Sequence, residues 1–337
     1  MTNFNDKIFG VSISTEDLSK HEEQLAKKGQ KFWDPIGEIN FKEINARSAK
    51  DLAKYHFLKA NPKHFSKYRL IWFLIGLSSS LFFWFLDFNV WIPAACFGFT
   101  ATYLILQNSY LSSLGKNLVR IQLAEKNNWL YDPNPGPNRY KILTSRFPKI
   151  FNRGDDYSQS ITNEYWGLST LKQKEYFFNG GLFYYSFKIG DERKTHLNHY
   201  LFIRLEKELK SEFLLSPEKK SIFNVFRSKE INTESVEFNK LFEFSYNGEK
   251  DEKAVEIVKS LSPAVQLKLI ELVKNKGAFD VLFSKSTVLF LMEDPLLPEM
   301  KTNLFKSVEI KTNDAEKVEK EISSLLDIGV SIAKYLN

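Results

Sequence analysis

Two histidines three residues apart, His196 and His199, form the only close histidine pair in this chain, and histidine is a common metal ligand. Zinc sites ordinarily need a third and a fourth ligand, and the single cysteine, Cys96, lies in a distant apolar segment. A spacing of three suits a helix, whereas the residues around the pair predict a turn that enters a strand. His196 and His199 are therefore weak metal candidates, and we expect no metal and no other cofactor.

Other residues that could do chemistry also favour a structural interpretation. Paired carboxylates occur at Asp155-Asp156 and at Glu234 and Glu237, but both pairs lie among polar residues typical of solvated turns. Asn179-Gly180-Gly181 is not followed by the Lys-Ser/Thr of a phosphate loop, and no Gly-x-Ser-x-Gly motif occurs. The sequence predicts no catalytic residue, which favours a non-enzymatic protein and leaves the question open.

The charge distribution argues against nucleic acid as a partner. The 337 residues carry a net charge of +6, spread thinly along the chain, and Lys alternates with Glu after Lys116. A nucleic-acid-binding protein concentrates its basic residues on one face. We expect an ordinary solvated surface and, with one cysteine, no disulfide framework.

The most unusual segment is apolar. Between Leu70 and Leu114 the only charged residue is Asp87. A helix rises about 1.5 Å per residue and a bilayer core is roughly 30 Å thick, so the runs at 70–86 and 90–111 each predict a membrane span. We expect a two-span transmembrane helical hairpin. A hairpin that enters the bilayer and returns without crossing it is the alternative.

Basic residues flank both predicted spans, and the turn between the spans has none. This asymmetry predicts a membrane protein with both termini in the cytoplasm. The same side chains could contact lipid headgroups, although a plain topology signal is the simpler interpretation. The residues are Lys54, Lys59, Lys63, Lys67, Arg69, Lys116 and Arg120.

Around the hairpin the sequence predicts an α+β protein with four regions. Residues 1–69 form a cytoplasmic helical arm and 70–114 the hairpin. A helix extension and a strand-rich cytoplasmic subdomain occupy 115–230, and a cytoplasmic α+β subdomain occupies 231–337.

Local patterns predict individual elements. Ser262-Pro263 begins a helix that Gly277 ends, and 279–283 and 287–292 predict strands. Asn179-Gly180-Gly181 predicts a hairpin turn between strands at 176–178 and 182–189. A further strand is expected at 140–143, and a last helix at 314–336.

The stretch EFNKLFEFSYNGEKDEKAVEIVKSLSPAVQLKLIELV, followed by FDVLFSKSTVLFLM, resembles a bacterial membrane family designated domain of unknown function 3137. The likeness is specific over 237–292, where Phe238, Phe242, Ala254, Leu261 and Pro263 match recurrent positions. The resemblance implies a bacterial source, and hence a location in the bacterial cytoplasmic (inner) membrane. It also implies a helical arm, two close spans and a cytoplasmic mixed domain. It implies no activity and no site residue.

These observations favour a membrane-tethered cytoplasmic scaffold or protein-binding module. The expected partners are the lipid bilayer and either another protein or a second copy of the chain. Two other functions stay open. One is an enzyme whose site is assembled from distant residues, and the other is an oligomeric channel or a membrane-remodelling hairpin.

Overall fold

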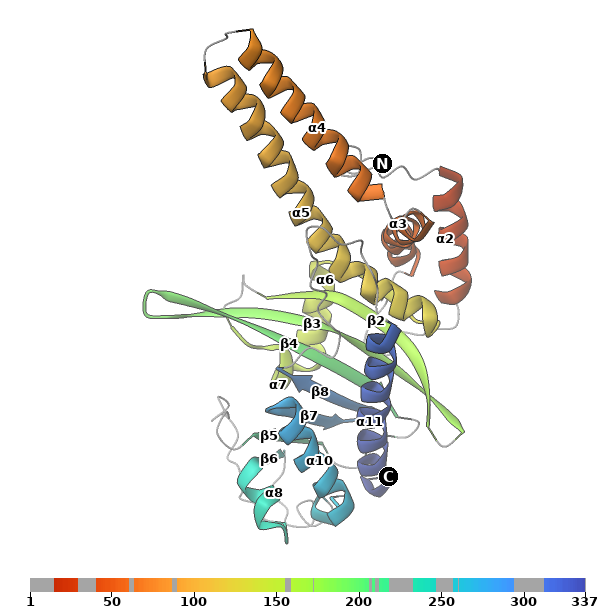
Figure 1. Cartoon of the computed structure of the whole chain (residues 1–337). Coiled ribbons are helices and arrows are strands. Elements are labelled where there is room, and N and C mark those ends of the chain that lie inside the picture. Colours follow the sequence, from red (N-terminus) through yellow and green to blue (C-terminus); the bar gives the residue numbers. More distant parts are fainter. Residues whose placement is uncertain are drawn as a thin grey trace.

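A computed structural model describes residues 15–29, 41–60, 64–86, 90–154, 159–171, 173–205, 208–209, 212–217, 233–246, 257–259, 261–293 and 312–336. Four helices come first: α2 (Thr15–Gly29), α3 (Phe41–Ala60), α4 (His64–Phe85) and α5 (Trp91–Lys126). Strand β1 (Leu130–Asp132) and two short helices, α6 (Pro137–Arg146) and α7 (Pro148–Phe151), follow. Figure 1 shows these elements above and around a central sheet.

The rest of the described chain supplies most of the sheet. The strands are β2 (Ser160–Leu171), β3 (Lys174–Ile189), β4 (Glu192–Arg204), β5 (Phe213–Pro217), β6 (Phe242–Tyr246), β7 (Phe279–Ser284) and β8 (Thr287–Met292). The helices are α8 (Val236–Leu241), α10 (Pro263–Lys276) and α11 (Thr312–Leu336).

All eight strands form one antiparallel sheet in the order β1-β2-β3-β4-β8-β7-β5-β6. The β7–β8 hairpin pairs with β4, so strands from both sides of residue 230 share one ladder. An eight-stranded antiparallel sheet with helices is therefore the core of the protein.

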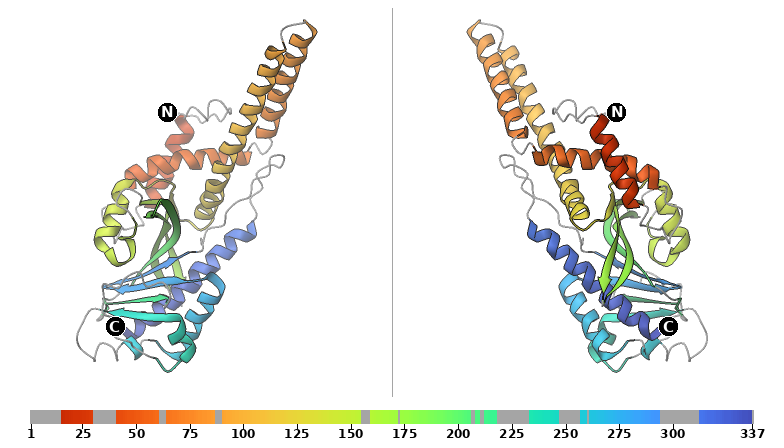
Figure 2. Two further views of the ribbon diagram at one scale, coloured as in Figure 1. Left: turned by 90° about the vertical axis from the view of Figure 1, so that its left-hand side faces the viewer. Right: turned by 90° about the vertical axis from the view of Figure 1, so that its right-hand side faces the viewer.

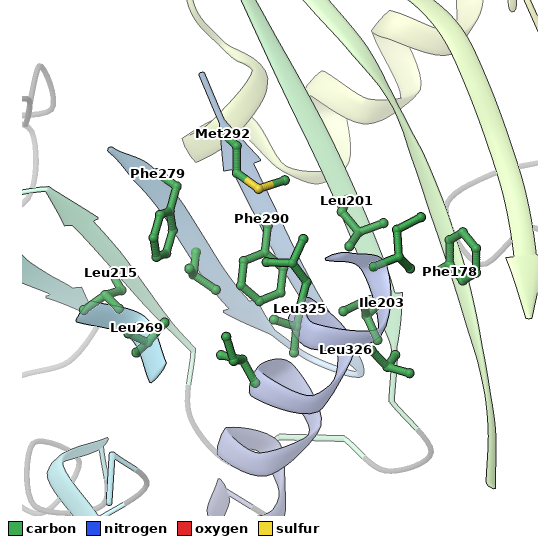
Figure 3. Packing of buried hydrophobic residues seen from close by; sticks show 14 of the residues in the cluster. Phe178, Leu201, Ile203, Leu215, Leu269, Phe279, Phe290, Met292, Leu325 and Leu326 are labelled. Atoms are coloured by element: carbon green, nitrogen blue, oxygen red, sulfur yellow. The ribbon is translucent and has the colours of Figure 1, made fainter. Parts of the chain in front are cut away.

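Helices cover both faces of the sheet (Figure 2). On one face α5, α8, α10 and α11 pack on the larger apolar cluster. Figure 3 shows Leu325 and Leu326 of α11 beside Phe290 of β8 and Ile203 of β4. On the other face α6 and α7 contribute Leu143, Phe147, Ile150 and Phe151 to a second cluster. Side chains alternate along each strand, which gives the sheet two apolar faces to bury.

Helix α10 follows the sequence prediction closely. It begins after Ser262 with Pro263 at the first helical position, where the missing N–H costs little. It ends before Gly277, whose φ of 76° favours glycine. The strands β7 and β8 and the last helix, α11, also lie where they were predicted.

Two local predictions are wrong. The segment at 140–143 belongs to helix α6, which begins at Pro137 after Gly136, and is not a strand. Asn179-Gly180-Gly181 lies inside β3 and is not a turn. A Cβ at Gly180 would overlap the ring of Tyr165, so this glycine gives a neighbouring aromatic side chain room.

The prediction of two membrane spans is also wrong. Within the described residues, no helix is long and apolar enough to cross a bilayer. The apolar part of α4, Leu70–Phe85, extends only about 24 Å at 1.5 Å per residue. The apolar part of α4 therefore falls short of the roughly 30 Å that a bilayer core requires, and Pro93 and Gly98 make the first part of α5 less apolar.

This finding corrects three predictions that depended on the spans. The fold class with a two-span transmembrane hairpin at 70–86 and 90–111 is overturned. The membrane description of the protein and its location in the bacterial cytoplasmic membrane, with both termini in the cytoplasm, are overturned with it. The two segments instead form antiparallel helices, α4 and the first half of α5, called the α4–α5 hairpin below.

Candidate interaction surface

Small and hydroxyl side chains hold the two helices of the α4–α5 hairpin together. A Cβ at Gly76 would overlap the side chain of Thr100, so only glycine allows this close approach. The Ser80 hydroxyl donates to the Pro93 carbonyl at 3.1 Å. Nearer the sheet, the rings of Trp72 and Tyr103 lie 4.7 Å apart. The seam of the hairpin therefore uses its smaller residues and leaves most of its large apolar ones outside.

The outer surface of the α4–α5 hairpin is apolar. Of the large hydrophobic side chains exposed in the described residues, all but three lie between Leu70 and Leu106. Phe85 is 85 % exposed and Trp91 is 75 % exposed. The others on this surface are Leu70, Ile71, Phe73, Leu74, Ile75, Leu77, Leu81, Phe82, Trp84, Leu86, Val90, Ile92, Phe97, Phe99, Ile105 and Leu106.

The extent of this apolar surface is unusual for a monomer. An aromatic side chain presents about 150–250 Å² and an aliphatic one somewhat less, and these residues are on average a little over half exposed. Their combined apolar area is therefore on the order of 2,000 Å². The largest patch on a typical monomeric protein is about 300–600 Å². The hairpin thus exposes several times the apolar area that a monomer keeps in water.

Charge is almost absent from the same segment. Asp87 is the one charged residue between Leu70 and Leu114, and it lies outside the described residues. No charged side chain is present on the described parts of the surface, 70–86 and 90–106. Association through this surface would not require charged groups there to be buried.

Of the basic residues that were predicted to contact lipid headgroups, the structure describes the side chains of only two, and both are buried. Lys63 lies outside the described residues, and so do the side chains of Lys59, Lys67, Arg69 and Lys116. Lys54 and Arg120 are both buried. The Lys54 amine lies 3.8 Å from the carboxylate of Asp51 on the same helix.

Arg120 lies in the junction between α3, α5 and β1. Its guanidinium hydrogen bonds the hydroxyl of Tyr131, which also donates to the Asn163 side chain at 2.6 Å. Burial raises the pKa of Tyr131 far above its usual range, and the positive charge of Arg120 opposes that rise. In this position Arg120 stabilises the attachment of the hairpin to the sheet.

The predicted metal candidates point to opposite faces of the sheet, because side chains three apart on one strand alternate. The His199 Nε2 atom lies 2.8 Å from the Tyr165 hydroxyl on one face. On the other face the ring of His196 stacks on Tyr185 at 5.2 Å and on Phe187 at 5.1 Å. In the part of the chain that the structure describes, no group of three or more His, Cys, Asp or Glu could hold a metal ion.

The paired carboxylates do not converge on a site. Asp155 and Asp156 lie outside the described residues. Glu234 and Glu237 are exposed, and Glu237 forms an ion pair with Lys274 at 2.9 Å that is open to solvent.

Sequence reasoning missed a buried polar network on the α6 face of the sheet. The Arg139 Nε atom donates to Glu164 Oε1 at 2.8 Å, and the Tyr200 hydroxyl donates to the same oxygen at 2.9 Å. Asn179 accepts from Arg139 at 3.5 Å and donates to the Tyr165 carbonyl at 3.1 Å. Burial raises the pKa of the Glu164 carboxyl, and the charge of Arg139 opposes that rise. The network connects α6 to three strands.

A small hollow lies where α2, α3, α5 and β1 meet. Its volume is about 40 Å³, which suits a few water molecules and not an organic ligand. Glu125 at its wall pairs with His56 at 2.9 Å, and Ser48 donates to the Tyr131 carbonyl. Apolar side chains line most of the remainder: Leu25, Leu52, Ile121, Ala124 and Trp129. The hollow is a packing feature of the junction.

Comparisons of the chain with family models, with curated proteins and with solved structures give no match. The resemblance to the domain of unknown function 3137 family therefore stays a prediction. The α4–α5 hairpin is the feature of the described chain that its own packing explains least, and it is the candidate functional surface.

Proposed function

We propose that this protein is an interaction module whose contact surface is the α4–α5 hairpin. The observation that carries the proposal is the concentration of exposed large apolar side chains between Leu70 and Leu106. Burying apolar area stabilises a complex by about 25 cal/mol per Å² before the costs of association are subtracted. A surface on the order of 2,000 Å² is ample for a stable protein–protein contact.

The arrangement of the hairpin supports a docking role. The α4–α5 hairpin projects beyond the sheet and the helices that cover it, while the second half of α5 packs on the core (Figures 1 and 2). The buried junction around Arg120 and Tyr131 fixes α5 to β1. A partner would therefore meet a surface carried on a rigid base.

Site-specific photo-crosslinking in cells tests this function. A benzophenone amino acid replaces Leu106 on the hairpin or, as a matched control, Leu267 on α10; both are 59 % exposed. We expect covalent polypeptide adducts from position 106 and at least ten-fold fewer from position 267. Equal yields at the two positions, or no polypeptide adduct at position 106, would overturn the proposal.

A further inference from the structure

We infer that the polypeptide which covers the α4–α5 hairpin is the hairpin of a second copy of this chain. This inference rests on the proposed function and names its partner. The product is a bundle in which α4 and α5 of one copy lie against α4 and α5 of the other.

The chemistry of the surface suits self-association. In a two-fold symmetric contact each surface meets its own counterpart, so a charged surface would repel itself. The described hairpin carries no charged side chain on 70–86 or 90–106, and its exposed residues are mainly Leu, Ile, Phe and Trp. Such a surface can pack against an identical surface, because the same apolar residues form both sides of the contact.

The available area matches what a homodimer needs. If one of the two broad faces of each hairpin is covered, about half of the exposed apolar area is buried, on the order of 1,000 Å² per copy. The total is then on the order of 2,000 Å², which is where the range for obligate homodimers begins. The cores of such interfaces are also more apolar than ordinary surfaces.

The shape of the molecule allows the contact. The α4–α5 hairpin extends away from the sheet in the views of Figures 1 and 2, so a second hairpin can lie alongside it. Gly98 on α5 is open, because a Cβ built there meets no atom within 4 Å. A neighbouring helix can approach closely at this position.

The test uses two co-expressed copies of the full chain that carry different affinity tags. Phe82→Glu and Gly98→Glu each place a charge on the hairpin at a position that is open in the single chain. Leu267→Glu is the control, because Leu267 is as exposed as Phe82 (59 % and 61 %) but lies on α10. Far-UV circular dichroism checks that each variant keeps its helix and strand content.

We expect the two tagged copies to co-purify and the assembly to have at least twice the 39.3 kDa mass of one chain in detergent-free buffer. Phe82→Glu and Gly98→Glu should each reduce co-purification at least ten-fold, and Leu267→Glu should leave it unchanged. A single-chain mass, or equal effects of all three variants, would overturn the inference.

The photo-crosslinking at position 106 separates the two possible failures. Adducts with a different polypeptide, together with a single-chain mass, would overturn self-association and leave the interaction function standing. Flotation of the purified chain with phospholipid vesicles, without any polypeptide adduct, would overturn both.

Discussion

Breaking the buried ion pair between Arg139 and Glu164 should destabilise the fold severely. The two side chains are 6 % and 0 % exposed, and the closest nitrogen–oxygen distance is 2.8 Å. Charges whose centres lie about 4 Å apart attract each other by ~4 kcal/mol at an effective dielectric constant of 20. Arg139→Met removes the cation and leaves Glu164 buried, so we expect unfolding to become easier by about 3–5 kcal/mol at neutral pH.

Two further variants distinguish a charge effect from a packing effect. Glu164→Gln removes the negative charge that Arg139 contacts at 2.8 Å and should cost a similar amount. The double variant removes both charges and keeps an amide oxygen for the Tyr200 hydroxyl. Its loss in the free energy of unfolding should therefore be smaller, by about 2 kcal/mol or more, than the sum of the two single losses. Lys274→Met is the control, because the solvent-exposed pair of Lys274 with Glu237 should contribute less than ~1 kcal/mol.

The loss in Arg139→Met should depend on pH in one direction. Burial raises the pKa of Glu164 in the folded protein, and removing the opposing charge of Arg139 raises it further. A carboxyl whose pKa is higher in the folded than in the unfolded state does not lower the free energy of unfolding at a pH below its usual pKa of about 4.3, because it is protonated in both states there. Its cost grows as the pH rises toward the folded-state pKa. The deficit relative to the wild-type chain should therefore shrink as the pH falls toward 4.

Urea unfolding, monitored by circular dichroism, measures these differences. All variants are compared at one chain concentration, because association also stabilises the folded state. If the losses in unfolding free energy of the two single variants simply add in the double variant, the ion pair between Arg139 and Glu164 is refuted. A deficit for Arg139→Met that does not change with pH would refute the role of the Glu164 charge.

Two smaller predictions concern packing in the sheet. Gly180→Ala should lower stability by about 1–3 kcal/mol because its Cβ would overlap the Tyr165 ring. A thermal unfolding midpoint equal to that of the wild-type chain would contradict the assigned contact. Tyr165→Phe should cost about 0.5–1.5 kcal/mol by removing the 2.8 Å hydrogen bond between its hydroxyl and the Nε2 of His199, and a stability equal to the wild type in urea would contradict that bond.

Local sequence rules succeeded where one short segment decides the structure. The proline after Ser262 and the glycine at 277 define the two ends of α10 through backbone geometry alone. The short apolar runs at 279–283 and 287–292, joined by a short turn, likewise predicted β7 and β8. Such elements need no information from distant parts of the chain.

The same rules failed where distant residues decide. Asn179-Gly180-Gly181 has the composition of a turn, yet its amide bonds the Tyr165 carbonyl and its glycines make room for aromatic rings from two neighbouring strands. The network of Arg139 and Glu164 joins residues 25 positions apart that only the sheet and α6 bring together. No local pattern at Glu164 indicates a buried carboxylate.

The apolar segment gave a mixed result. Its two runs do form helices joined by a short connection, as their composition predicted. The inference that they cross a bilayer was wrong, because no helix among the described residues is both long and apolar enough for a span. The arrangement of small residues in the seam, with large ones outside, became visible only when α4 was placed against α5.

The central claim is that the hairpin of a second copy of this chain covers the α4–α5 hairpin, and thiol labelling tests it most directly. Phe85→Cys and Leu267→Cys are made separately in a Cys96→Ser chain, which removes the one native thiol. Each purified protein reacts with a water-soluble maleimide without detergent or lipid. In the isolated chain Phe85 is the more exposed residue, at 85 % against 59 %. We predict that the cysteine at position 85 of the folded protein reacts at least ten-fold more slowly than the one at position 267. After unfolding in urea the two should react equally fast. A rate at position 85 of the folded protein that equals or exceeds the rate at position 267 would contradict the account.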